Sequence, residues 1–293
     1  MSIFGRICSI VAISTIAAAL EAAIKKLSAA GIENPKLDSK LLLCHAADIE
    51  PVELITSSNR RLPAQNLQSF EALIERRVLR EPVSHLIGER EFWSLPFIVT
   101  SDVLDPRPAS ETLIEAALQY VEDTKKGFSV LDLGTGSGCL LITMLKECPL
   151  AAGIGVDISE AALKVARRNG TKHSVENRSK FVLSPWGKNL HESFDLILCN
   201  PPYIAESEWG LLEPEVVVYE PRVALFAGDD GLSAFCQLAP DVYRLLNLDG
   251  VAVIECGLGQ VASLIEIFSN AGLKHLETLS DLEGIERCCV FSR

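Results

Sequence analysis

The stretch Val130–Leu145 restricts the possible fold more than any other, because an apolar strand runs directly into a glycine-rich turn and then into a helix. Val130–Leu133 is short and mostly apolar, and apolar residues recur at helical spacing after Gly134, Gly136 and Gly138. Glycines in such a turn let a ligand approach the backbone, and the helix N-terminus offers free N–H groups. The pattern predicts a strand–turn–helix unit of an α/β protein, either with a ligand at the turn or with none.

The residues around this unit indicate which ligand the turn suits. A dinucleotide fingerprint has its third glycine one place later, where Cys139 stands, and this disfavours NAD. The next predicted strand, Gly153–Asp157, ends in an acid roughly 20 residues beyond the glycines, where such folds place a ribose-binding carboxylate. Asp157 can equally end a strand without a ligand. The strand Lys180–Leu183 then leads to Trp186, which can cover an adenine or pack in a half-buried loop.

A second motif, Asn200-Pro201-Pro202-Tyr203, follows the apolar strand Leu196–Cys199. The proline pair ends the strand, and the residue before a proline is held extended, so Asn200 has a narrow choice of conformation. Its carboxamide is thereby fixed beside exposed carbonyls and an aromatic ring. Such a set can grip a planar –NH2 group, with the Asn200 oxygen and a proline carbonyl accepting its two hydrogens. The alternative is a strand-ending turn in which Tyr203 merely packs.

Together these residues resemble the class I S-adenosylmethionine-dependent methyltransferases. Within that superfamily, the chain resembles the protein-glutamine N5-methyltransferases that modify peptide chain release factors, from about Ile16 to Phe291. The tetrapeptide is shared with adenine-N6 DNA and guanine-N2 RNA methyltransferases, but Pro106–Pro108 and Glu220–Arg222 narrow the resemblance to the glutamine enzymes. Pro185 departs from the family, which often has an acid before the tryptophan. Further matching residues are Glu111, Ala224, Leu225, Gly228, Asp230, Gly231, Leu232, Glu255, Gly257 and Gln260.

The resemblance implies an enzyme that methylates the side-chain amide N5 of the glutamine in the Gly-Gly-Gln loop of release factors, and so modulates translation termination. Its implied methyl donor is S-adenosyl-L-methionine, and no metal is expected. Arg107 and Glu111 are implied to shape the site. The implied catalytic residues are Asn200, Pro201 and Tyr203, and Pro202 joins them in substrate binding. The implied cofactor-binding residues are Gly134, Thr135, Gly136, Ser137, Gly138, Asp157, Trp186 and Asn200.

The order of predicted elements indicates two domains. After Ser129 strands and helices alternate, which predicts a mostly parallel sheet with helices on both faces. The resemblance implies a Rossmann-like sheet of seven strands, with an antiparallel edge near residues 274–279 and 287–292. Helices are predicted near 16–30, 38–47 and 66–80, and a hairpin over 91–99. We expect an N-terminal extension over 1–13, a helical substrate-recognition domain over 14–85, a hairpin linker over 86–105 and a methyltransferase domain over 106–293.

Composition restricts the partners and the compartment. With 293 residues, 48% of them hydrophobic, the chain can form a substantial core. A net charge of −12 argues against holding duplex nucleic acid through phosphate contacts and suits a basic protein partner. None of the nine cysteines shows paired C-x-x-C spacing, which indicates core thiols in a reducing compartment. The five histidines form no metal pattern.

The N-terminus resembles a signal peptide, because an apolar run follows Arg6 and ends in Ala17-Ala18-Ala19. The run continues as an amphipathic helix to Gly31, so we expect a cytoplasmic protein. We also expect release factors as the protein partner, no stable nucleic-acid binding, no membrane partner and a monomer. Three alternatives remain: a glutamine methyltransferase of a ribosomal protein, a nucleic-acid base-amine methyltransferase, and a cofactor-binding module without catalysis.

Overall fold

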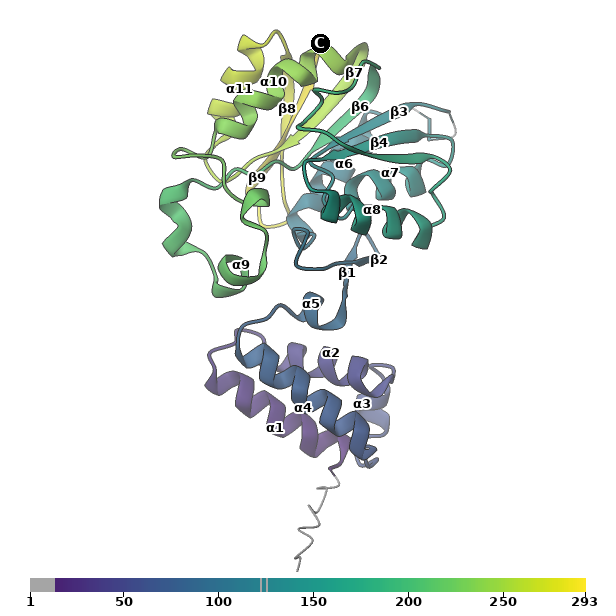
Figure 1. The fold of residues 1–293 in the computed structure, drawn as a ribbon, viewed down its shortest axis with the longest axis vertical. Coiled ribbons are helices and arrows are strands. Elements are labelled where there is room, and N and C mark those ends of the chain that lie inside the picture. The colour runs from purple at the N-terminus through teal and green to yellow at the C-terminus, as the bar shows by residue number, and fades with distance from the viewer. Residues whose placement is uncertain (1–13, 122, 125) are drawn as a thin grey trace, which may run out of the picture. The chain divides into compact units, whose positions relative to one another are not determined.

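The computed structural model describes residues 14–121, 123, 124 and 126–293, and Figure 1 draws their helices and strands. The chain divides into two compact units, one that ends at Ile87 and one that comprises Gly88–Arg293. The hairpin expected as a linker belongs to the second unit, because its Phe92 and Phe97 are buried in the core of that unit. The predicted extension over residues 1–13 lies outside the described residues.

The first unit is helical in its described residues. Its helices are α1 (Ile16–Ala29), α2 (Pro35–Ala47), α3 (Glu53–Thr56), α4 (Ala64–Val78) and α5 (Val83–Ile87). Apolar residues three and four places apart bury one face of α1, where it contacts α2 and α4: Ile16, Ala19, Ala23 and Leu27. A buried ion pair between Arg77 and Asp38, at 2.8 Å, links α4 to α2.

Two of the predicted helices begin earlier than the sequence pattern indicated. α2 begins at Pro35 rather than at residue 38, and α4 begins at Ala64, directly after Pro63, rather than at residue 66. Proline suits the start of a helix, since the N–H that it lacks would have no partner there. Helices α3 and α5 were not predicted, because four and five residues are too few to show a helical period.

The second unit alternates strands with helices along most of its length, as predicted. Its strands are β1 (Glu89–Phe92), β2 (Leu95–Ile98), β3 (Ser129–Leu133), β4 (Ala152–Asp157), β5 (Ser179–Leu183), β6 (Phe194–Cys199), β7 (Leu246–Glu255), β8 (Lys274–Ser280) and β9 (Glu286–Ser292). Its α-helices are α6 (Glu111–Gln119), α7 (Cys139–Glu147), α8 (Glu160–Lys172), α9 (Pro214–Tyr219), α10 (Ser233–Leu245) and α11 (Val261–Asn270). Short 3₁₀ helices are η1 (Pro108–Ser110), η2 (Glu206–Leu211) and η3 (Arg222–Ala224).

Seven of these strands form one sheet in the order β5-β4-β3-β6-β7-β9-β8. The first five run parallel, while β9 pairs antiparallel with both β7 and β8. The expected Rossmann-like sheet with an antiparallel edge is therefore confirmed. β1 and β2 form a separate antiparallel hairpin.

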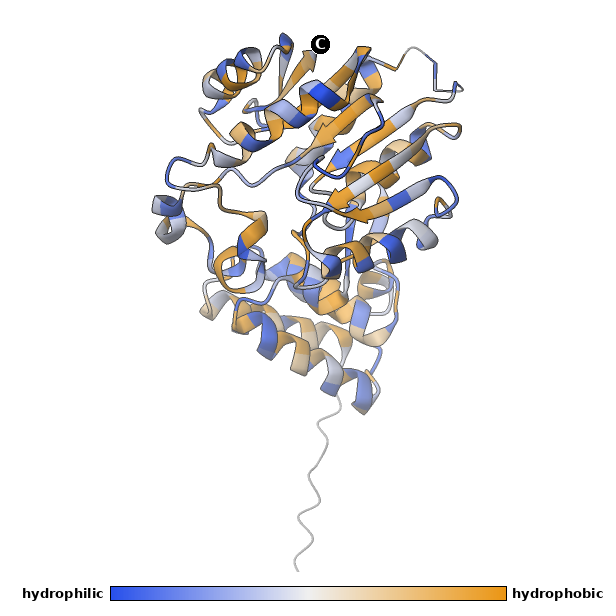
Figure 2. Ribbon diagram, turned by 45° about the horizontal axis from the view of Figure 1, so that its top comes forward, coloured by the Kyte–Doolittle hydropathy of each residue, from blue (hydrophilic) through white to orange (hydrophobic). Residues whose placement is uncertain are grey.

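Side chains of the central strands alternate between two cores, one on each face of the sheet. In β3, for example, Leu131 and Leu133 join the core that includes α10 and α11, whereas Val130 joins the core that includes α6 and α7. Figure 2 shows these strands largely in orange, while the helices carry both colours. This burial on both faces fits the continuous apolar runs of the sequence.

The register of the sheet brings its carboxyl ends into one row. Leu133 of β3 lies opposite both Val156 of β4 and Cys199 of β6, and Cys199 lies opposite Ile254 of β7. The residues that follow each of these, including Asp157 and Asn200, therefore emerge at the same edge. The strand order also reverses here, since β4 and β6 flank β3, and ligands of open α/β sheets bind at such a switch point.

Three features are absent from the described part of the chain. None of its helices combines the length and apolar character that a membrane-spanning segment requires. Its eight cysteines are all free, and its His, Cys, Asp and Glu side chains form no group of three or more that could hold a metal.

Candidate active site

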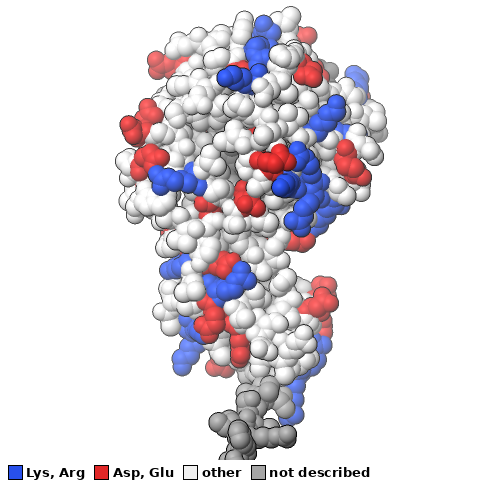
Figure 3. Space-filling view, in the orientation of Figure 1, with Lys and Arg blue, Asp and Glu red and all other residues white. Residues whose placement is uncertain are grey.

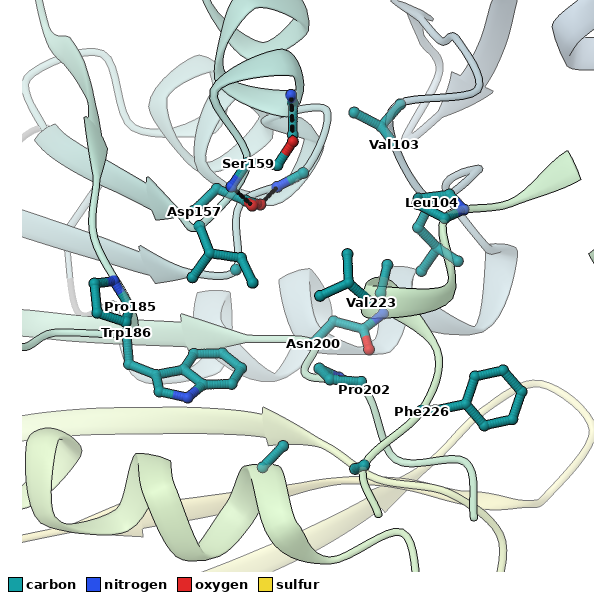
Figure 4. Close-up of a pocket in the computed structure, with 18 of the residues that line it drawn as sticks. Val103, Leu104, Asp157, Ser159, Pro185, Trp186, Asn200, Pro202, Val223 and Phe226 are labelled. Carbon is teal, nitrogen blue, oxygen red and sulfur yellow. Dashed lines mark hydrogen bonds between the residues drawn. The ribbon is translucent and has the colours of Figure 1, made fainter. Parts of the chain in front are cut away.

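A cavity of about 340 Å³ opens at the carboxyl edge of the sheet. Figure 4 shows its walls, which come from the turns after β3, β4, β5 and β6 and from the segments around Val103 and Val223. Six of the predicted site residues line it: Gly134, Gly136, Asp157, Trp186, Asn200 and Pro202. Motifs that lie far apart in the sequence thus meet at one cavity.

Asp157 ends β4 and is held by two backbone N–H groups. Gly136 N–H donates to Oδ2 and Ser159 N–H donates to Oδ1, both at 2.9 Å. Burial raises the pKa of this carboxyl, and the two backbone hydrogen bonds oppose that rise. Each carboxylate oxygen can accept a further hydrogen bond, so the group can bind hydroxyls of a ligand in the cavity.

Trp186 lies against the glycine turn. The indole Nε1–H donates to Gln237 Oε1 at 3.1 Å, and the backbone at Trp186 has φ 50°, which is unusual for a residue with a side chain. A Cβ at Gly134, where φ is +76°, would lie 3.5 Å from Cζ3 of the indole. The exposed glycine backbone and the indole therefore form one end of the cavity.

The other residues of the predicted cofactor set support the turn rather than line the cavity. The hydroxyl of Thr135 donates to Asp132 Oδ2 at 2.6 Å, and the carbonyl of Ser137 accepts from Asn169 Nδ2 at 2.9 Å. Gly138 has φ +82° and precedes α7. Burial raises the pKa of Asp132, directly beneath the turn, to about 7.

The carboxamide of Asn200 has a defined orientation. Its Nδ2 donates to the hydroxyl of Ser110, at the end of η1, with 2.9 Å between the two atoms. This bond leaves Oδ1 as the end of the amide that can accept hydrogen bonds at the cavity. Pro201 is buried, and Pro202 lines the cavity beside Asn200 (Figure 4).

Tyr203 does not line the cavity but is fixed beside it from two sides. Its hydroxyl donates to Glu255 Oε1 at 3.3 Å, and its carbonyl accepts from Gln260 Nε2 at 2.9 Å. Burial, with the neighbouring Glu255 carboxylate, raises the pKa of the phenol. A Cβ at Gly231, where φ is +73°, would lie only 2.3 Å from the Tyr203 carbonyl oxygen, so only glycine fits there.

Arg107 and Glu111, which the resemblance implied in shaping the site, lie in two different places. Arg107 pairs with the buried carboxylate of Glu220 at 2.5 Å. This ion pair links the Pro106–Pro108 segment to the Glu220–Arg222 segment. Burial raises the pKa of Glu220 to about 7, although Arg107 opposes the rise. Glu111 accepts from the backbone N–H of Trp93 at 2.7 Å and lines a separate hollow, so it supports the β1–β2 hairpin.

The segment Glu206–Ala224 comprises η2, α9 and η3, and its last residues, from Pro221 to Ala224, contribute Pro221, Val223 and Ala224 to the wall of the cavity. None of these three elements has a buried side chain. Backbone hydrogen bonds between Ile204 and the residues Leu225 and Ala227 close the base of the segment. Within it the guanidinium of Arg222 lies 4.4 Å from the ring centroid of Trp209.

Sequence reasoning did not find several residues of the site. Ser110 follows Pro106–Pro108 closely, but a lone serine gives no signal of its own. The apolar lining residues Val103, Val223 and Phe226 resemble any core residue, because only the folded chain brings them to the cavity. Gln237 lies on α10 and carries no motif.

Comparisons with known proteins agree with this geometry. The family model described as PrmC N-terminal domain matches residues 18–88, and the one described as methyltransferase small domain matches residues 89–214. A release factor glutamine methyltransferase of Rhodospirillum rubrum is 40% identical over 268 residues, which cover 92% of this chain and 82% of that protein. Its counterpart from Cereibacter sphaeroides is 43% identical over 269 residues, covering 92% of this chain and 95% of that protein.

The chain belongs to the release factor glutamine methyltransferases. The predicted family is thereby confirmed, and with it an enzyme that uses S-adenosylmethionine. A solved structure of the hMettl16 catalytic domain in complex with a MAT2A 3′UTR hairpin shares the fold. It has a TM-score of 0.56 and 17% identity, and the match covers 75% of this chain and 81% of that one.

The cavity residues of this methyltransferase fit S-adenosylmethionine. The exposed backbone of Gly134 and Gly136 leaves room for close approach, and Asp157 offers acceptors for hydroxyl groups. The indole of Trp186 and the apolar residues opposite it offer surfaces on which a purine can lie.

Proposed function

We propose that this chain transfers the methyl group of S-adenosylmethionine to the side-chain amide N5 of the glutamine in the Gly-Gly-Gln loop of peptide chain release factors. The observation that carries the proposal is the orientation of Asn200. Its nitrogen is engaged by Ser110, so its oxygen is the end that can accept a hydrogen bond from a substrate –NH2 group. Membership of the release factor glutamine methyltransferases supports the same substrate.

The chain acts mainly by positioning a weak nucleophile. An amide nitrogen reacts poorly because its lone pair is delocalised into the carbonyl. Asn200 Oδ1 and the Pro201 carbonyl accept its two N–H groups, aim its lone pair and stabilise the positive charge that develops on it. When bound, S-adenosylmethionine supplies an electrophilic methyl group on a sulfonium. A strong base is not required, because the methylated amide loses its proton readily to water or a carbonyl.

The remaining site residues bind and enclose the two substrates. Asp157 accepts hydrogen bonds from ribose hydroxyls, and Trp186 covers the adenine. The backbone of Gly134 and Gly136 faces the cofactor, and the rest of the turn up to Gly138 supports it. Tyr203 packs against the substrate amide, and its hydroxyl bond to Glu255 supports that position.

We further propose that the helical unit, residues 14–87, provides a second surface for the release factor. Glycines let the acceptor loop approach the site closely, but a flexible loop must be ordered on binding. Binding energy from a distant surface can offset that cost, so isolated loop peptides should be poor substrates. The proposal places the enzyme in the cytoplasm as a monomer.

A nucleic-acid substrate is the weaker alternative. Basic side chains gather on α8, but Arg167 pairs with Glu160 and Lys172 pairs with Glu89. On the face shown in Figure 3, charges of both signs lie side by side over the second unit. Such a surface does not favour phosphate contacts.

Methyl transfer to defined acceptors tests the proposal. The purified chain is incubated with labelled S-adenosylmethionine and, separately, with intact release factor, a Gly-Gly-Gln loop peptide, ribosomal proteins, RNA and DNA. We expect label on the release-factor glutamine, located by mass spectrometry, and much less on the peptide. Label on a ribosomal protein or nucleic acid, with none on release factors, would contradict the proposed substrate. Equal labelling of peptide and intact factor would contradict the second surface.

A further inference from the structure

Gln260 is a half-buried residue whose side-chain amide bonds to the site motif. It stands directly before α11, where serine, threonine, aspartate or asparagine usually caps a helix, yet its side chain makes no hydrogen bond to the first turn of that helix, all of which the structure describes. Its Oε1 instead accepts from the backbone N–H of Gly257, and its Nε2 donates to the carbonyl oxygen of Tyr203, both at 2.9 Å. Helix capping therefore does not explain this glutamine.

The Asn200–Tyr203 motif depends on anchors from other segments. Its two prolines have no backbone N–H group, so they cannot donate hydrogen bonds that would fix the middle of the motif. At one end the side-chain amide of Asn200 bonds to Ser110, and at the other end the carbonyl of Tyr203 bonds to Gln260. The position of Tyr203 therefore depends in part on Gln260.

Two glycines show how closely Gln260 packs against Tyr203. A Cβ added at Gly257 would lie 2.9 Å from Gln260 Oε1 and 3.0 Å from Cδ2 of the Tyr203 ring. A Cβ added at Gly231 would lie 2.3 Å from the Tyr203 carbonyl oxygen and 2.9 Å from Gln260 Nε2. Glycine backbones thus leave the space in which the amide and the tyrosine meet, and interiors packed this closely transmit displacements.

From these contacts we infer that Gln260 is a positioning residue, which fixes the backbone of Tyr203 so that the ring keeps its place against the substrate amide. The inference rests on the proposed function of Tyr203. A primary amide suits this role because it offers a donor and an acceptor on one planar group. One side chain can therefore join the turn after β7, through Gly257, to the turn after β6, through Tyr203.

Two variants of similar size remove the bond to Tyr203 in different ways. Gln260→Glu replaces the donor with a carboxylate oxygen, which repels the carbonyl, whereas Gln260→Met leaves the carbonyl without its partner. We expect kcat to fall by about 10²-fold in Gln260→Glu, the effect of misplacing a group near the reacting atoms, and by less in Gln260→Met. The KM for the release factor should change little, because an orienting contact acts on the reacting geometry rather than on uniform binding.

Calorimetry with S-adenosylmethionine separates this role from a general loss of folded protein. We expect both variants to keep the wild-type Kd and the wild-type number of binding sites, so that the lower kcat belongs to folded enzyme. Gln119→Glu, which alters an exposed amide at the end of α6, is the matched control and should keep the wild-type kcat. A normal kcat in Gln260→Glu, or a fall in the number of sites that accounts for the lost rate, would overturn the inference.

The carbonyl signal of Tyr203 reports the hydrogen bond without turnover. Tyr203 and Ile204 are the one Tyr-Ile pair in the sequence, so ¹³C at tyrosine carbonyls and ¹⁵N at isoleucine amides select this carbonyl in a carbonyl–amide correlation spectrum. Loss of an accepted hydrogen bond moves a carbonyl signal to lower frequency. We expect this shift in both Gln260 variants and not in Gln119→Glu, and an unchanged signal in either Gln260 variant would overturn the inference. The spectra are recorded without acceptor, so they still test the contact between Gln260 and Tyr203 where the wild-type chain methylates no release factor and the proposed function itself fails.

Discussion

The side-chain nitrogen of Asn200 lies 2.9 Å from the hydroxyl oxygen of Ser110, although the two residues are 90 positions apart. Asn200 follows the central strand β6, whereas Ser110 ends η1 before the sheet begins. One hydrogen bond thus joins the tetrapeptide motif to the Pro106–Pro108 segment. A shift of either segment would therefore move the carboxamide of Asn200.

We expect Asp157→Ala to weaken S-adenosylmethionine binding, because the variant loses a charged acceptor for ribose hydroxyls. Such a hydrogen bond contributes about 1.5–3 kcal/mol, or roughly a 10- to 150-fold rise in Kd. Calorimetry on the folded variant measures this directly. Asp195→Ala, which removes an acid at the opposite, amino end of β6, is the control. An unchanged Kd in Asp157→Ala would refute the assignment.

We expect Asn200→Ala to reduce methyl transfer far more than it reduces cofactor binding. The lost oxygen would have aligned the acceptor nitrogen, and the loss of one such contact costs about 10²–10³ in rate. Single-turnover rates with saturating release factor, measured beside the Kd for S-adenosylmethionine, separate the two effects. Asn247→Ala, whose amide donates to Asp195 at 2.6 Å away from the cavity, should behave as wild type. Near-normal turnover in Asn200→Ala would exclude its role.

Glu255→Gln should raise stability more at pH 8 than at pH 5. Burial raises the pKa of Glu255 from 4.5 to about 7, so the folded state binds this proton more tightly than the unfolded state does. The resulting stabilisation is complete below pH 4.5 and is lost as pH rises through 7, whereas glutamine does not titrate. The gain in free energy of unfolding of the variant over the wild type, measured in urea, should therefore be larger at pH 8 than at pH 5 by on the order of 2–3 kcal/mol. A difference that does not change with pH would contradict the raised pKa.

Gly231→Ala should lower both stability and activity. Its Cβ would lie 2.3 Å from the Tyr203 carbonyl oxygen, and the positive φ of +73° adds backbone strain. Gly284→Ala is the matched control. Gly284 has φ +78°, but a Cβ added there would have no neighbouring atom within 4 Å, so this variant adds backbone strain without a steric clash. We expect about 1–2 kcal/mol of destabilisation in Gly284→Ala with normal kcat. A larger loss, with reduced kcat, is expected in Gly231→Ala, and equal behaviour of the two variants would show that Tyr203 tolerates displacement.

The parts of the site that sequence reasoning identified are those with a local signature. Gly134, Asp157 and Asn200 each stand where an apolar strand ends, and parallel strands bring such positions to one edge. The strand pattern likewise predicted the sheet, because strands buried on both faces appear as continuous apolar runs.

The remaining parts depend on contacts between distant segments. Ser110 has no distinguishing neighbour in the sequence, and its role follows only from its bond to Asn200. Thr135 and Ser137 belong to the glycine motif, yet their side chains and carbonyls support the turn from within. A motif identifies which residues matter locally, but it does not show which of them face the ligand.

The segment Glu206–Ala224 has a consequence for how this enzyme can diversify. Glu220 is the one buried side chain of this segment, and the exposed Val223 stands at the cavity. Away from Glu220, mutations along it can therefore accumulate during evolution without unfolding the domain, while those near Val223 still alter the wall of the cavity. We expect substitutions and length changes to concentrate here when related enzymes adapt to new acceptor proteins, with the chemistry at the sheet edge inherited intact.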